Sequence, residues 1–257
     1  MISRKGTSEY FMEAAGLGAF MLSACLCTVA IEHPGLPLRT AIESALARRG
    51  LMGAAMGATA IAITYSPWGR RSGAHINPSV TLAFLRLGRI TRIDAAAYVA
   101  FQTLGALAGV LLAALLAGPA LQHPAVHFAV TVPGGSGVAV AFAAELAISA
   151  LLMTAVLVLS GTPALAPRCG LVCGTLVAAF ITFEAPLSGM SMNPARTLAS
   201  GVFAGDLRAL WLYLTAPPLG MLLAAEFHLL RTEYRGQAPL FGSVSCDRDD
   251  RACPNHS

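Results

Sequence analysis

The chain has 257 residues, of which 56% are hydrophobic and only 12% are charged, and its formal net charge is +4. Soluble proteins carry about 25% charged residues, so this chain has too few polar side chains to cover a soluble fold of its length. The composition predicts an all-α membrane protein with several spans. Its arginines are scattered among the loops, which argues against a nucleic-acid-binding surface.

Six apolar segments are predicted to be helical spans. In chain order they cover residues 9–31, 51–65, 95–117, 138–159, 169–183 and 209–230, and a start one or two turns earlier stays open for the second. Residues 32–50 are predicted to be a loop between the first two spans.

We expect one domain over residues 9–230, made of two repeat halves, 9–117 and 138–230. A short polar lead, 1–8, precedes it. The polar tail, 231–257, is expected to be disordered because it contains few apolar residues.

One twelve-residue stretch occurs twice, as residues 72–83 and 188–199. Seven of the twelve positions are identical, and the shared residues include an Asn followed by a Pro. Asn caps free backbone N–H groups and Pro suits the first helical position, so each copy predicts the start of a helix.

The apolar runs after these Asn-Pro pairs, 78–87 and 194–203, are short. Ten residues form a helix of about 15 Å, which is about half of a bilayer core. Each half of the chain then contains three spans and one half-helix. Three spans are an odd number, so the second half inserts upside down, and the two half-helices enter from opposite faces.

Paired half-helices of this kind predict a polar pathway that rejects ions. Their N-termini meet near the midplane, where free N–H groups and helix dipoles repel cations. The amides of Asn77 and Asn193 are expected to donate hydrogen bonds to a passing water, which interrupts proton hopping. The predicted midplane residues are Asn77, Pro78, Ser79, Asn193, Pro194 and Ala195.

Arg196 lies one turn after Asn193, in a segment with no other charge. An arginine within a membrane is costly and usually functional, so we expect it to line the outer constriction. The alternative is an ion pair between Arg196 and Glu184 at the interface.

Glu13 and Glu145 are single carboxylates in the first span of each half. They could relay protons in a coupled transporter, but we favour hydrogen bonds that support the two re-entrant loops. His75 is expected to line the inner pore or to cap a turn, and Gln102 to form a packing hydrogen bond.

Other residues receive structural interpretations. The glycine pairs spaced by four predict close helix packing; they are Gly53/Gly57, Gly105/Gly109 and Gly170/Gly174. Trp68, Trp211 and Tyr213 are predicted to be interfacial anchors.

Cys169 and Cys173 could hold a metal, but without a third ligand nearby we interpret them as buried small residues, and no cofactor or metal is expected.

At these residues the chain resembles the major intrinsic protein family, the aquaporins and glycerol facilitators. The resemblance is carried by Glu13, residues 72–78, Gln102, Glu145 and the second Asn-Pro-Ala-Arg motif, 193–196. It implies six transmembrane helices and two re-entrant half-helices in an inverted repeat, a homotetramer with one pore per subunit, and passive flux.

The resemblance also implies a selectivity filter of Met56, Ile181, Met190 and Arg196, with Gly57 as the alternative to Met56. Typical water channels carry His where Ile181 stands, and glycerol facilitators usually carry Asp where Thr197 stands. Ser79 replaces the Ala of the first motif and keeps a small residue.

We therefore expect a passive channel for water, with small neutral solutes such as glycerol, ammonia, urea or a metalloid hydroxide open as permeants. A proton-coupled transporter and a scaffold that kept the fold are the alternatives, and an enzyme is not expected. Twelve of the 17 cations lie on the side of the termini, which predicts cytoplasmic termini in a plasma (inner) membrane.

Overall fold

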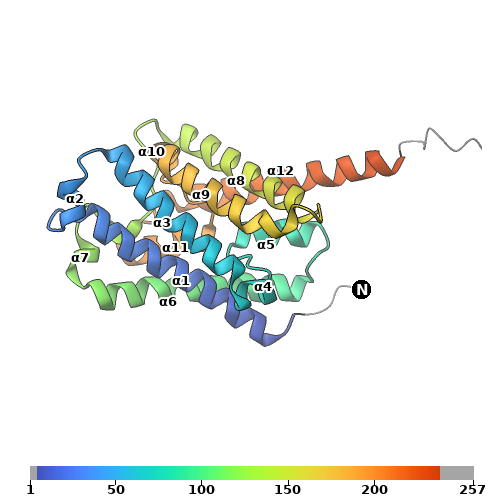
Figure 1. Cartoon of the computed structure of the whole chain (residues 1–257), viewed down its shortest axis with the longest axis horizontal. Coiled ribbons are helices and arrows are strands. Elements are labelled where there is room, and N and C mark those ends of the chain that lie inside the picture. Colours follow the sequence, from blue (N-terminus) through green and yellow to red (C-terminus); the bar gives the residue numbers. More distant parts are fainter. Residues whose placement is uncertain (1–4, 238–257) are drawn as a thin grey trace, which may run out of the picture.

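Six long helices run side by side, and two half-length helices lie among them (Figure 1). The computed structural model describes residues 5–237. The long helices are α1 (Thr7–Glu32), α3 (Ala45–Tyr65), α6 (Arg92–Ala117), α8 (Val138–Ser160), α9 (Cys169–Phe183) and α12 (Leu210–Gln237). The half-length helices are α5 (Pro78–Arg86) and α11 (Pro194–Ala204), as the Asn-Pro signals predict.

Short helical turns fill the connections between these elements. They are α2 (Pro37–Ala41), α4 (Pro67–Ser72), α7 (Pro119–Gln122), η1 (His127–Ala129), η2 (Ala166–Arg168) and α10 (Ala185–Ser188). The turns α4 and α10 directly precede the two copies of the repeated loop, and each ends at a glycine with a positive φ.

Five of the long helices are long and apolar enough to cross a membrane, counted over the described residues. They are α1, α6, α8, α9 together with η2, and α12 up to Thr232. The sixth, α3, has 21 residues, but it carries Arg48 and Arg49 close to its start and contains three glycines.

The structure differs from the sequence prediction at the first loop and at the end of the last helix. The loop predicted over 32–50 contains α2. The helix α3 begins at Ala45, within the earlier start that the prediction left open, because the Ser44 hydroxyl caps it by accepting from the Ala47 N–H at 3.3 Å. The helix α12 continues to Gln237, beyond the predicted end of the domain; the rest of the tail lies outside the described residues.

Glycines let pairs of long helices touch backbone to backbone, which confirms the packing predicted from their spacing. In the pair α3–α9, a Cβ added to Gly57 would lie 2.5 Å from the Gly174 carbonyl oxygen, and one added to Gly174 would lie 2.7 Å from that of Gly57. Gly105 and Gly109 of α6 similarly face the carbonyls of Ala14 and Gly18 in α1. Since α3 and α9 come from different halves, their contact joins the two repeats.

The exposure of three aromatic side chains tests their prediction as interfacial anchors, and one of the three is wrong. Trp68 and Trp211 have exposed side chains, as interfacial anchors would. Tyr213 is fully buried instead, and its hydroxyl donates to the Ser188 carbonyl. Tyr98 makes the equivalent bond to the Ser72 carbonyl in the first half.

The α3–α9 contact predicts different outcomes for two glycines of the same helix. Gly57→Ala places a methyl group against the Gly174 carbonyl and is expected to cost about 1–3 kcal/mol of stability. Gly50→Ala is the matched control, because its added Cβ meets only Thr182 at 3.9 Å and alanine favours the helix. Thermal unfolding in detergent measures both, and equal melting temperatures would contradict the close contact.

Candidate functional site

The two half-length helices begin at facing asparagines. Asn77 caps α5, and its Oδ1 accepts from the Ser79 N–H at 2.8 Å. Asn193 caps α11, and its Oδ1 accepts from the Arg196 N–H at 3.2 Å. The N-termini of α5 and α11 therefore meet, and the two helices run away from this point.

The same side chains also tie the two loops to each other. Asn77 Nδ2 donates to the Met192 carbonyl at 2.7 Å, and Asn193 Nδ2 donates to the Ile76 carbonyl at 2.8 Å. Each amide thereby spends one of its two N–H groups on the opposite loop. The sequence predicts that both amides donate to a passing water. In the structure, only one N–H of each amide is left for a molecule between the two asparagines.

The other residues of the two motifs lie behind these asparagines. Pro78, Ser79, Pro194 and Ala195 are buried and do not line the cavity described below, although the sequence analysis grouped them with the asparagines. Pro suits the first helical position, and the small residue after it allows close packing.

A buried carboxylate holds the first loop. Glu13 of α1 is fully buried, and Oε1 accepts from the Ser72 hydroxyl at 2.7 Å and the His75 N–H at 3.0 Å. Oε2 accepts from the Ile76 N–H at 2.6 Å and from Gln102 Nε2 at 2.8 Å. This is the geometry that the loop-support hypothesis requires.

Glu145 of α8 repeats the arrangement in the second half. It is also fully buried, and Oε1 accepts from the Ser188 hydroxyl at 2.8 Å and the Ser191 N–H at 2.6 Å. Oε2 accepts from the Met192 N–H at 2.8 Å. Neither carboxylate lines the cavity, and all four of their oxygens accept hydrogen bonds from the protein.

These hydrogen bonds hold a backbone that non-glycine residues rarely adopt. Ala74 and Ile76 have φ values of 46° and 38°, and Met190 and Met192 have φ values of 53° and 52°. Such conformations are unfavourable, above all for a β-branched residue such as Ile76, and they persist only where surrounding contacts enforce them. The strain points the Ile76 and Met192 carbonyls at the facing asparagines.

His75 and Gln102 surround the first loop in different ways. His75 lines the cavity, and its Nδ1 lies 3.1 Å from the Thr81 hydroxyl while its ring stacks on Phe84 at 4.7 Å. Gln102 is fully buried outside the cavity and also donates to Thr81 at 3.2 Å.

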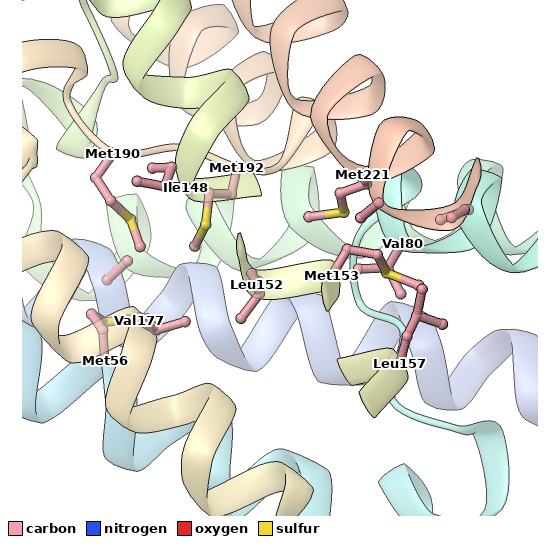
Figure 2. Close-up of a cluster of buried hydrophobic side chains, with 14 residues drawn as sticks. Met56, Val80, Ile148, Leu152, Met153, Leu157, Val177, Met190, Met192 and Met221 are labelled. Carbon is pink, nitrogen blue, oxygen red and sulfur yellow. The ribbon is translucent and has the colours of Figure 1, made fainter. Parts of the chain in front are cut away.

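A cavity of about 520 Å³ passes both loops and is lined by both asparagines. Its wall includes the four residues expected to form the filter: Met56, Ile181, Met190 and Arg196. Figure 2 shows Met190 and Met192 extending from the second loop toward Val177 and Met56. Since all four of these labelled residues line the cavity, this part of the wall is largely thioether and aliphatic.

Arg196 lines the cavity with an unused donor. Its Nη1 is buried and has no hydrogen-bond partner in the described structure. The alternative ion pair with Glu184 does not form, since no salt bridge within 4 Å joins them and both Glu184 carboxylate oxygens are without a partner. The guanidinium N–H is therefore free to bind a molecule in the cavity.

A second arginine on the cavity wall was not among the site residues predicted from the sequence. Arg49 lines the cavity, and its Nε donates to the Thr182 carbonyl at 3.1 Å, one residue from Ile181. The neighbouring Arg48 is buried and paired with Glu32 at 3.1 Å. Both arginines fall in the loop predicted over 32–50. Only an earlier start of α3 puts them on a helix, and this is the signal that could have identified Arg49 as a lining residue.

Comparisons with known proteins agree with this architecture. Residues 5–228 match the sequence profile of the family described as major intrinsic protein. The chain is 41% identical to aquaporin NIP3-1 of Zea mays over 177 residues, covering 68% of this chain and 57% of that protein. It is 35% identical to aquaporin NIP6-1 of Arabidopsis thaliana over 188 residues, covering 72% of this chain and 60% of that protein.

A solved structure has a similar fold. The aquaglyceroporin from Plasmodium falciparum superposes with a TM-score of 0.72, covering 86% of this chain and 94% of that one at 19% identity, which is evidence for the fold alone. The chain spans less than two thirds of the length of the curated relatives described above.

The loop-holding carboxylates give a testable difference in stability. Glu145→Gln replaces one accepting oxygen with an NH₂ group that faces N–H or O–H donors. The loss is expected to be roughly 2–5 kcal/mol, read as a lower melting temperature in detergent.

The matched control is Glu226→Gln, which removes a half-exposed ion pair with Arg86. Such pairs contribute about 0–1 kcal/mol, so this variant is expected to melt close to the parent protein. Equal losses in the two variants would show that the Glu145 hydrogen bonds do not hold the second loop.

Proposed function

Because the chain belongs to the major intrinsic protein family, we propose that this membrane channel passively conducts water and small uncharged solutes along the cavity between its two asparagine-capped loops. The observation that carries the proposal is the meeting of Asn77 and Asn193 beside one cavity, with Arg196 lining the same cavity. The family does not consist of enzymes, and a channel needs no catalytic group.

The electrostatics of the cavity favour neutral molecules. Two helix N-termini direct their positive ends at the asparagines, and Arg196 and Arg49 add two guanidinium groups at one end. A cation would lose its hydration without gaining negative ligands at the asparagines. A neutral molecule can accept one hydrogen bond from each Asn amide and pass on.

The filter residues support a broader choice of permeant than water alone. Met56, Ile181 and Met190 bring apolar walls to the cavity, and Arg196 brings one polar wall with an unused N–H. A small solute with an apolar side and a hydroxyl group would fit both kinds of wall. Water remains the first candidate, and small neutral hydroxylated solutes are the second.

A proton-coupled transporter is disfavoured by the two carboxylates. Glu13 and Glu145 lie outside the cavity wall, and every oxygen accepts a hydrogen bond from a loop or side chain. A coupling site would need to exchange protons with the pathway, whereas the described hydrogen bonds of the two carboxylates reach lining residues only through backbone N–H groups, which do not carry protons away.

The setting of the channel is also proposed. Twelve of the 17 cations are assigned to the side of the membrane on which the termini lie. This excess supports an orientation with both termini in the cytoplasm, at a plasma (inner) membrane. Many large apolar side chains of the long helices are exposed, as lipid and neighbouring subunits would require. We also propose a homotetramer, which membership of the family supports.

The channel proposal is tested in liposomes that contain the purified protein. We expect osmotic shrinkage faster than in empty liposomes, with a low activation energy and no dependence on a pH gradient. Well-folded protein that leaves water and solute permeability at the level of empty liposomes would refute the proposal. Flux that requires a proton gradient would favour the transporter.

The filter assignment is tested by Ile181→His. The imidazole is longer than the isoleucine side chain and can hydrogen-bond across the cavity, so it is expected to narrow the apolar wall and to lower solute flux roughly tenfold relative to water flux. Phe183→His is the matched control, because Phe183 lies on the same helix with 71% of its side chain exposed away from the cavity. Unchanged selectivity in Ile181→His would remove Ile181 from the filter.

A further inference from the structure

Two cysteines form a pair on the wall of the cavity. Cys169 is the first residue of α9 and Cys173 lies one turn later, so both side chains project from the same face of the helix. Their sulfur atoms are 3.9 Å apart, and both residues line the cavity. The sequence interpretation of two buried packing residues is therefore incomplete, because the thiols share access to the cavity.

The pair lies far from the filter along the same helix. Cys169 begins α9, whereas Ile181 lies twelve residues later, which corresponds to about 18 Å of helix. The cavity wall around the pair consists mainly of small residues, Ala60, Thr64, Gly170 and Gly174. An aromatic group bound to both sulfurs would be larger than the side chain of any of these four residues.

The pair offers two sulfur ligands and no third. Among the described residues, no group of three or more His, Cys, Asp or Glu side chains could hold a metal ion. The described residues therefore do not supply the four ligands of a structural zinc site there. Soft acceptors that bind two thiolates remain suitable, because thiolate ligands select soft centres.

We propose that Cys169 and Cys173 form a dithiol site that binds soft, thiol-seeking centres with two open positions, such as trivalent arsenicals and soft metal ions, and that the bound centre obstructs the cavity. The sulfur spacing is close to a van der Waals contact, so one atom can bond to both sulfurs after a small side-chain rotation. An occupant would extend from α9 into the cavity because both residues line it.

The chemistry is balanced without any oxidant. A trivalent aryl arsenoxide, R–As=O, forms two As–S bonds with the two thiols and releases one water that carries both thiol hydrogens and the arsenoxide oxygen. Arsenic stays trivalent and both sulfurs stay at the thiolate level. A lone cysteine cannot form this cyclic product, so the reagent distinguishes a pair from single thiols.

The test uses phenylarsine oxide on full-length protein in which only this pair of cysteines remains. Cys25, Cys27, Cys246 and Cys253 are replaced by alanine, and the protein is kept reduced. Intact mass is expected to show one arsenical per chain with loss of one water. Osmotic water flux in liposomes is expected to fall at least roughly fivefold and to recover with ethanedithiol but not with 2-mercaptoethanol.

Two single variants in the same background, Cys169→Ser and Cys173→Ser, provide the matched controls. Each is expected to retain its own untreated flux after treatment and wash, because one thiol holds the arsenical weakly. Absence of the adduct from the paired protein, an equally stable adduct in either single variant, or full adduct occupancy with unchanged flux would overturn the proposal.

The flux measurement rests on the proposed channel function, whereas the mass measurement does not. Untreated protein that conducts neither water nor solute would count against the channel, and the mass shift would still report whether the dithiol binds. The two proposals therefore fail separately.

Discussion

The structure depends on two buried carboxylates that accept backbone hydrogen bonds from strained loops. Glu13 and Glu145 each bind two consecutive N–H groups and one serine hydroxyl. Those N–H groups belong to loops with left-handed conformations at Ile76 and Met192. Without an internal acceptor, the loops would leave polar backbone groups unpaired inside an apolar bundle, which costs several kcal/mol for each group.

The strained loops in turn place the asparagines. The carbonyls of Ile76 and Met192 receive the amides of Asn193 and Asn77, so each loop holds the cap of the opposite helix. The site is shared between the repeats and cannot form within one half alone. The glycine contact between α3 and α9 joins the same two halves, and these two helices carry Met56 and Val177 of the cavity wall.

The cavity combines two chemical characters along its length. Its arginine end has guanidinium groups beside thioether and aliphatic walls, and its other end has two thiols among small residues. Neutral hydrogen-bonding molecules suit the first region, and soft electrophilic centres suit the second. The proposed passage of neutral solutes and the proposed capture of thiol-seeking reagents therefore concern the same cavity.

The sequence by itself determined the helical class, the duplicated Asn-Pro starts and the equivalence of Glu13 and Glu145, because these follow from composition, capping chemistry and spacing. It could not determine the start of α3, because Arg48 and Arg49 are typical of a loop when considered alone. In the structure Arg48 pairs with Glu32 and Arg49 donates to the Thr182 carbonyl, so both can lie on the helix. It also did not reveal that the asparagines bind opposite loops. Those contacts join residues more than one hundred positions apart, and only the packing of the two halves decides which groups meet.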